Sequence, residues 1–206
     1  MVGQTDPVRR RLVTLVSVLA VGLAACGGED TTLQGATLEP APVVSALQAP
    51  EGVDGTPFRF VADQGGLLAV YFGYTQCPDL CPTTMADVKA ALRRLGTKAA
   101  RVDVAMVTVD PARDTAAVLR TYLSHFFPAE QVHALRFEDP VAQKAVEAGF
   151  LATSTVTTTA TGAVEVSHTA MTSIVDDQGR IAVQWPFGTS AETMAHDLNV
   201  LLNRAP

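Results

Sequence analysis

The chain places two cysteines just after an apolar run, and this junction constrains the fold more than any other feature of the sequence. Residues 67–74 are almost all apolar or aromatic, as expected of a strand buried on both faces of a sheet. Pro82 then begins a stretch with apolar residues at helical spacing, and proline suits the first helical turn because its missing N–H would have no partner there. Cys77 and Cys81 are therefore predicted to lie in a strand-to-helix turn, with Cys81 at the helix N-cap.

The rest of the chain after residue 50 alternates predicted strands and helices and ends in a hairpin and a helix. Further strands are expected over 58–62, 102–109 and 134–137, and helices over 115–126 and 141–148. Residues 164–175 and 181–185 are expected to pair across Asp177-Gln178-Gly179, and the last helix to span 191–202. This order predicts one α/β domain, a thioredoxin-like mixed sheet flanked by helices.

The first 25 residues are predicted to be a lipoprotein signal peptide. Three arginines, Arg9 to Arg11, precede an apolar run over 12–25 that is short for a membrane-spanning helix. The run ends in Leu23-Ala24-Ala25-Cys26, which resembles the bacterial lipobox and implies that Cys26 is acylated as the mature N-terminus. Ordinary cleavage nearby, which would leave Cys26 as a free thiol, is the alternative.

Residues 26–50 are expected to be a flexible tether between this anchor and a domain over 51–206. The segment is polar and then rich in alanine and proline, with no sustained periodicity. A partly ordered N-terminal extension is the alternative for its second half. The location that follows is a domain lipid-anchored to the outer face of the bacterial cytoplasmic membrane.

Composition excludes some classes of function. With 48% hydrophobic and 17% charged residues, the chain is globular rather than disordered. The formal net charge of -6, without a basic patch, argues against nucleic acid as a partner. Acylation of Cys26 would leave Cys77 and Cys81 as an isolated thiol pair, in a compartment that permits disulfides.

The spacing of this pair bears on its chemistry. Three residues separate Cys77 from Cys81, one more than in redox enzymes of the thioredoxin type, and the extra residue opens the chelate for two sulfurs around one metal. A helix N-terminus favours thiolate over thiol. Two thiolates suit Cu(I), and an added imidazole makes the site suitable for Cu(II) as well. A stabilising disulfide and a thiol–disulfide redox couple are the alternatives.

A third ligand is sought among four histidines. His168 stands where the late hairpin begins, a connection that lies beside the cysteine-bearing turn in a thioredoxin-like sheet. His125 near a helix end, His133 in a short loop and His196 on the polar side of the last helix are expected to have no part in the site. Spacing alone leaves open whether His168 is a ligand.

Three separated motifs resemble the Sco/SenC family, and the resemblance extends from about Gly55 to the last helix. The motifs are Phe72-Gly73-Tyr74-Thr75-Gln76-Cys77-Pro78-Asp79-Leu80-Cys81-Pro82-Thr83-Thr84, then Val109-Asp110-Pro111-Ala112-Arg113-Asp114-Thr115, and finally His168-Thr169-Ala170 followed by Ile174-Val175-Asp176-Asp177-Gln178-Gly179-Arg180-Ile181. The family consists of copper-binding, thioredoxin-like assembly factors for cytochrome c oxidase. The resemblance implies that Cys77, Cys81 and His168 bind one copper ion, Cu(I) or Cu(II).

The function that the resemblance implies is copper delivery. The domain would receive copper from an extracytoplasmic donor and pass it to the dinuclear copper site of cytochrome c oxidase subunit II. The alternative is a thiol–disulfide oxidoreductase that reduces the cysteines of that site, with Cys77 and Cys81 as its catalytic residues. A peroxiredoxin-like peroxidase, for which no motif places a sulfur-activating arginine, and a structural lipoprotein with a stapled domain are further alternatives.

Two other segments allow more than one interpretation. Residues 153–161 are rich in threonine and are expected to form a solvated flexible loop before His168, with a role in His168 mobility or partner docking as the alternative. Asp110, Arg113 and Asp114 could form an acid–base cluster. The structural interpretation is preferred, in which Asp110 ends a strand and Asp114 caps the next helix, and partner docking by this loop is a further alternative.

Overall fold

The computed structural model describes residues 1–3, 31–51 and 55–204. Cys26, the core of the predicted signal peptide and the start of the predicted tether lie outside the described residues. Every helix and strand described below lies in one compact unit, Thr31–Pro206. In the described part of the chain, no helix is both long and apolar enough to cross a bilayer.

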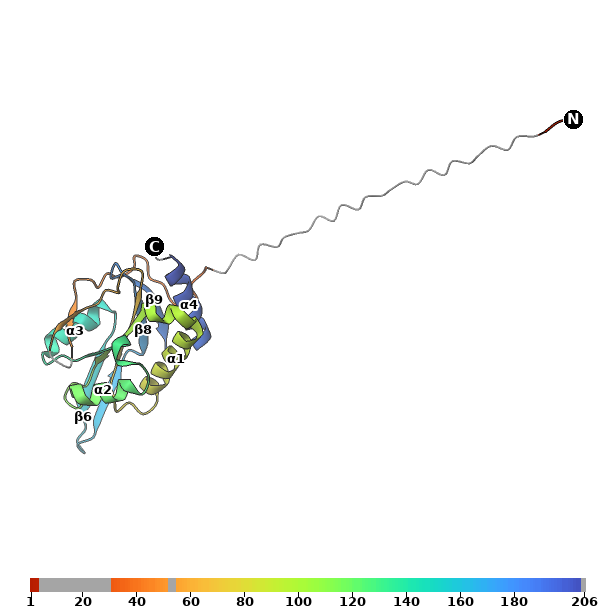
Figure 1. Ribbon diagram of the computed structural model, residues 1–206. Coiled ribbons are helices and arrows are strands. Elements are labelled where there is room, and N and C mark those ends of the chain that lie inside the picture. Colours follow the sequence, from red (N-terminus) through yellow and green to blue (C-terminus); the bar gives the residue numbers. More distant parts are fainter. Residues whose placement is uncertain (4–30, 52–54, 205–206) are drawn as a thin grey trace. The chain divides into compact units, whose positions relative to one another are not determined.

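A five-stranded mixed sheet forms the centre of the domain, in the order β5-β4-β3-β8-β9 (Figure 1). Strands β3, β4 and β5 run parallel, whereas β8 pairs antiparallel with β3 and β9 pairs antiparallel with β8. The strands are β3 (Leu67–Gly73), β4 (Val102–Thr108), β5 (Val132–Leu135), β8 (Met171–Val175) and β9 (Ile181–Pro186). The predicted α/β class, with a mixed sheet and a final antiparallel hairpin, is confirmed.

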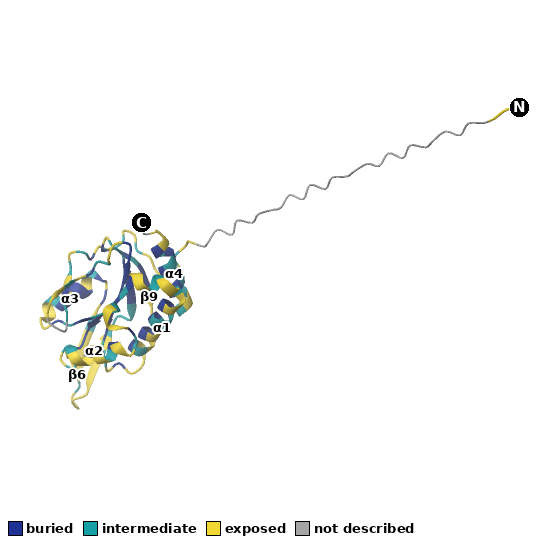
Figure 2. Ribbon diagram, in the orientation of Figure 1, coloured by how far each residue is buried: buried dark blue, intermediate teal, exposed yellow. Residues whose placement is uncertain are grey.

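Helices cover both faces of the sheet. One core contains residues of α1 (Leu80–Leu95), α2 (Ala116–Ser124) and α4 (Ala191–Arg204), and the other contains residues of α3 (Pro140–Gly149). Two short 3₁₀ helices, Gly96–Arg101 and Ala129–Gln131, precede β4 and β5. All of β3 is buried, because Leu67, Ala69 and Tyr71 face the first core while the residues between them face the second. Figure 2 shows central strands of the sheet in the dark blue of buried residues.

The segment from Thr31 to Pro50 differs from the predicted tether, because it packs on the domain. Strand β1 (Gln48–Pro50) pairs with β2 (Pro57–Arg59), Val44 is fully buried, and Ala36 forms a β-bridge to Gln184. The buried carboxylate of Asp197 accepts hydrogen bonds from the backbone N–H groups of Gln34 and Gly35, at 2.7 and 2.9 Å. An apolar side chain in the core and satisfied backbone groups fix this part as an ordered extension.

The threonine-rich stretch is a strand rather than a flexible loop. Residues Ser154–Thr158 form β6, which pairs antiparallel with β7 (Val164–His168) in a separate two-stranded sheet. The predicted strand over 164–175 is therefore two strands, since the chain leaves this hairpin at His168 before β8 begins at Met171. Residues 155–158 of this strand are all threonine or valine, whose β-branched side chains favour strand structure, a signal that the sequence-based interpretation missed.

Candidate metal centre

Cys77 and Cys81 lie at the carboxyl end of β3, in the turn that leads into α1. Helix α1 begins at Leu80 with Asp79 as its N-cap residue, so Cys81 is the second helical residue and not the N-cap as predicted. Pro82 is the third residue of the helix. Proline is tolerated at this position because the N–H groups of the whole first turn lack intrahelical partners. The two cysteines are free thiols, 7% and 0% exposed, and the backbone N–H of Cys81 donates to Cys77 Sγ at 3.3 Å.

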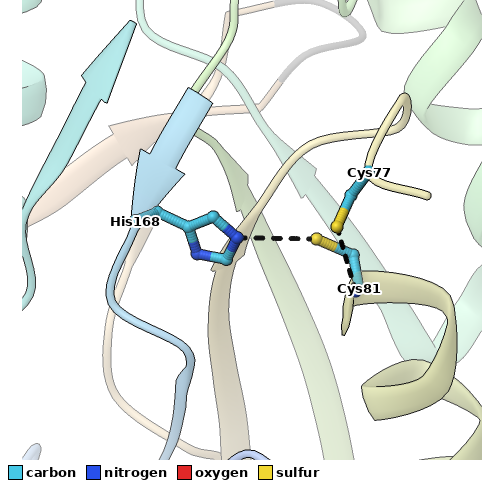
Figure 3. A group of neighbouring side chains, drawn as sticks. All are labelled: Cys77, Cys81 and His168. Atoms are coloured by element: carbon cyan, nitrogen blue, oxygen red, sulfur yellow. Dashed lines mark hydrogen bonds between the residues drawn. The ribbon is translucent and has the colours of Figure 1, made fainter. Parts of the chain in front are cut away.

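The structure brings His168 to this pair, from the end of β7 (Figure 3). The His168 Nε2 atom is 3.7 Å from Cys81 Sγ, and the three donor atoms of Cys77, Cys81 and His168 all lie within 4.8 Å of one another. Two sulfurs bound to one metal are at most about 4.6 Å apart, given metal–sulfur bonds of about 2.3 Å. The site therefore needs little closure to hold one ion, and two sulfurs with one imidazole suit copper.

The surroundings of His168 favour a neutral ring with a free nitrogen on the side of the sulfurs. Burial lowers the pKa of His168, so the imidazole is neutral at pH 7. Its Nδ1 is 3.2 Å from the backbone oxygen of Thr169, and the tautomer that donates there leaves the Nε2 lone pair facing Cys81. Tyr71 and Tyr74 contact the ring edge to face, with centroids 6.0 and 5.9 Å away.

Cys81 is buried deeply enough to reverse the predicted preference for thiolate. Burial raises the pKa of its thiol to about 12, and this outweighs a hydrogen bond from the Tyr71 hydroxyl at 3.5 Å that acts in the opposite direction. Desolvation of the anion is the largest of the influences on this pKa. A metal that binds here displaces the thiol proton, because thiolate is the ligand form of cysteine.

Gly73 makes room for the buried sulfur. A Cβ atom at this position would lie 3.1 Å from Cys81 Sγ and 2.5 Å from Cε1 of Tyr71. A side chain there would displace the sulfur, the phenol ring or both. The last residue of β3 is therefore part of the site, although it carries no ligand.

The loop after β4 supports the cysteine-bearing turn and does not form an acid–base cluster. The buried Asp114 carboxylate accepts from the backbone N–H of Thr75 at 3.0 Å, from the Thr75 hydroxyl at 2.5 Å and from the Thr108 hydroxyl at 2.6 Å. Asp114 is thus not a helix cap, and that role belongs to Thr115, whose side chain accepts from Val118 N. Arg113 forms an ion pair with Asp110 and donates to Gln76.

A cavity of about 370 Å³ opens at Cys77 and His168. Its lining comprises Tyr74, Cys77, Pro78, Asp79, Leu80, Val166, Ser167 and His168. The turn before α1 forms one side of the cavity and β7 the other. A metal at the three donors would thus be reachable from outside the domain.

The other three histidines lie elsewhere, as predicted. The ring of His133 contacts Glu51 at 2.8 Å, that of His196 contacts the backbone oxygen of Thr32 at 3.0 Å, and His125 is exposed near the end of α2. Within the described ranges, Cys77, Cys81 and His168 form the one group of His, Cys, Asp or Glu side chains placed to share a metal ion.

Fold and site together define a thioredoxin-like domain with a cysteine pair and an apposed histidine at one end of its sheet. The sequence profile of the family described as SCO1/SenC matches residues 52–203, and the chain belongs to this family. A SCO2-like protein of Rickettsia felis is 40% identical over 65 residues, which are 32% of this chain and 32% of that protein. The match thus spans about a third of the length of this curated relative.

Two solved structures extend the likeness over the whole domain. The apo Sco1 protein of Thermus thermophilus is 31% identical with a TM-score of 0.68, and the match covers 86% of this chain and 99% of that one. Bradyrhizobium japonicum ScoI with copper bound is 29% identical with a TM-score of 0.64, over 78% and 97% of the two chains. The predicted family and the thioredoxin-like fold are confirmed.

Proposed function

We propose that this protein binds one copper ion through Cys77, Cys81 and His168 and delivers it to the dinuclear copper site of cytochrome c oxidase subunit II. The observation that carries the proposal is the convergence of two sulfurs and one imidazole nitrogen within 4.8 Å at an accessible cavity. The similar ScoI of Bradyrhizobium japonicum holds copper, which supports copper as the metal here.

The donor set suits a carrier that must release its cargo. Two thiolates alone hold Cu(I), whereas the imidazole adds the borderline nitrogen ligand that Cu(II) prefers. His168 is on a separate hairpin from the cysteines, so one ligand can leave before the others. Transfer would then proceed by stepwise exchange of ligands with the receiving site, after the protein has taken copper from an extracytoplasmic donor.

The location proposed for this activity is the outer face of the bacterial cytoplasmic membrane, with the chain anchored by a lipid on Cys26. The support is the sequence Leu23-Ala24-Ala25-Cys26 after a short apolar run. Labelling of growing cells with a radioactive or clickable fatty acid tests the anchor. Cys26→Ser should abolish the label, and a label that persists in this variant overturns the lipid anchor on Cys26.

Copper binding is tested by metal analysis with absorption and EPR spectra of the reduced protein. We expect one copper per chain, loss of binding in Cys77→Ser and weakened Cu(II) binding in His168→Ala. Undiminished binding after replacement of both cysteines would overturn the site. Delivery is tested separately, by transfer of copper to the soluble domain of the oxidase subunit.

A second candidate function uses the same sulfurs for thiol–disulfide exchange. It is favoured by the free state of Cys77 and Cys81, whose sulfurs are within 4.8 Å of each other, and by the position of Cys77 in the lining of the cavity. The cysteines of the oxidase copper site would be reduced as Cys77 and Cys81 form a disulfide. His168→Ala separates the two functions, because it should preserve this reduction and impair copper delivery.

A further inference from the structure

His168 is attached to the domain differently from the two cysteines. The cysteines adjoin β3 and α1, which belong to the main sheet and its core, whereas His168 ends a hairpin whose strands β6 and β7 pair with each other alone among the described strands. Figure 1 shows this hairpin extending beyond the rest of the domain. Most of its side chains are exposed, so its packing gives little restraint. The base of the hairpin therefore sets the backbone position of His168, and the rings of Tyr71 and Tyr74 contact its imidazole.

The base of the hairpin is held by a buried carboxylate of α3. Glu147 is 1% exposed, and its Oε1 accepts a hydrogen bond from the Ser154 hydroxyl at 2.7 Å. Lys144 bridges the same two residues, with Nζ 2.7 Å from Glu147 Oε2 and 2.5 Å from the Ser154 backbone oxygen. Gln143 donates to Glu147 Oε1 at 2.9 Å. Such charge-assisted bonds to a buried acceptor are among the stronger polar contacts in proteins.

Ser154 is the residue directly opposite His168 in the β6–β7 register. The adjacent residues Thr153 and Thr169 are also hydrogen-bonded, because the backbone N–H of Thr169 donates to the backbone oxygen of Thr153 at 2.9 Å. Any movement of Ser154 relative to α3 is thus passed across one strand pair to the backbone that carries the imidazole. The contact with Glu147 is thus one of the attachments of this ligand to the domain, beside the short link from His168 to β8.

The backbone after α3 strengthens the same attachment. Leu151 adopts a left-handed conformation, with φ of 55°, that is unfavourable for a residue other than glycine. The backbone N–H of Ala152 donates to the backbone oxygen of Glu147 at 2.8 Å, and the backbone N–H of Leu151 donates to the backbone oxygen of Ala148 at 3.0 Å. These two bonds form the Schellman motif that ends many helices. Glu147 therefore holds the start of the hairpin through both its backbone and its side chain.

We infer that Glu147, Lys144 and Ser154 form a clamp that positions His168 over the cysteine pair. The inference rests on the proposed copper site and adds that α3, away from the metal, controls its nitrogen ligand. The clamp affects the two oxidation states unequally. Cu(I) is held by the two sulfurs without help, whereas Cu(II) depends on the imidazole as well. Loosening the clamp should release Cu(II) in preference to Cu(I).

Ser154→Ala in the full chain is the main test, because it removes the hydroxyl link while the Lys144–Glu147 ion pair stays. Lys144→Met is the second variant, and Thr157→Ala, further along β6, is the matched control. Amide exchange over 164–168 is measured without metal, and affinities are measured with Cu(II) sulfate and, against a chromogenic chelator, with Cu(I). We expect faster exchange and about tenfold weaker Cu(II) binding in the two clamp variants, in line with supporting residues of other metal sites. Cu(I) affinity should stay within about twofold of the wild type, as should both affinities of Thr157→Ala.

Two results would overturn the clamp. One is unchanged exchange over 164–168 in both clamp variants. The other is an equal loss of Cu(I) and Cu(II) affinity, which would indicate damage to the whole domain rather than displacement of His168. Failure of the wild type to bind either copper ion would instead reject the proposed function, and the metal-free exchange data would still decide whether the clamp holds the hairpin.

Discussion

The hydroxyl of Tyr71 donates a hydrogen bond to Sγ of Cys81, at 3.5 Å, from a ring that is 1% exposed. Burial and the neighbouring Cys81 sulfur raise the pKa of Tyr71, so the phenol stays a donor throughout the physiological range. A hydrogen bond to a metal-bound sulfur withdraws electron density from it. Tyr71 is therefore placed to tune a ligand without contacting the metal.

Tyr71→Phe should lower the Cu(II)/Cu(I) reduction potential and shift the sulfur-to-copper absorption band. The reason is that Cys81 becomes a stronger electron donor, which favours Cu(II), and the lost hydrogen bond is worth about 1 kcal/mol. Potentiometry and absorption spectra of the copper-loaded protein provide the measurement. Tyr122→Phe is the control, since its buried hydroxyl has no hydrogen-bond partner in the described part of the chain. Equal effects of the two variants would contradict the assignment.

Gly73→Ala should weaken copper binding and destabilise the fold. The new Cβ would lie 3.1 Å from Cys81 Sγ, and such overpacking costs about 1–3 kcal/mol. Chemical unfolding and copper titration measure the two effects. Gly149→Ala is the control, because its Cβ would meet the flexible Leu47 side chain, away from the cysteines. Copper affinity that stays at the wild-type value in Gly73→Ala would contradict the steric role.

Asp114→Asn should loosen the cysteine-bearing turn. The carboxylate accepts three hydrogen bonds from Thr75 and Thr108, and an amide has one accepting oxygen in place of two. We expect a loss of about 1.5–3 kcal/mol in the free energy of unfolding. Amide exchange at 75–77 should accelerate. Asp63→Asn, at an exposed position, should change neither quantity, and an unaltered turn in Asp114→Asn would disprove the support role.

Acid should detach the β6–β7 hairpin. Burial raises the pKa of Glu147, but hydrogen bonds from Lys144, Ser154 and Gln143 outweigh it, so the pKa lies below its ordinary value. A lowered folded pKa means that the stabilisation is complete above the unfolded pKa of about 4.3 and is lost as pH falls through the lower folded value.

Amide exchange over 154–158, corrected for its intrinsic pH dependence, measures this effect between about pH 6 and pH 3. Protection should fall with acid in the wild type, and Glu147→Gln should lack this component. Glu138→Gln, at a site 88% exposed, should behave as the wild type. A pH profile of Glu147→Gln that matches the wild type would reject the role of this carboxylate.

Local sequence patterns predicted much of the fold. The apolar run over 67–74 and the helical spacing after Pro82 correspond to β3 and α1, because a fully buried strand and a half-buried helix impose different periods on the chain. The prediction of a flexible tether failed because the deciding contacts are distant in sequence. Segment 31–50 has no period of its own, yet Val44 and the backbone at Gln34 find partners more than a hundred residues away.

The sequence by itself determined the ligand types, their order and the strand-to-helix turn that carries the two cysteines. Only the tertiary structure decided how those groups behave. Burial of Cys81 favours its thiol over the thiolate that the helix end suggested, because a buried sulfur loses the hydration that stabilises its anion. The approach of His168 depends on its pairing with Ser154 and on Glu147 beneath it. Desolvation and contacts between distant elements arise from packing, which residue spacing does not encode.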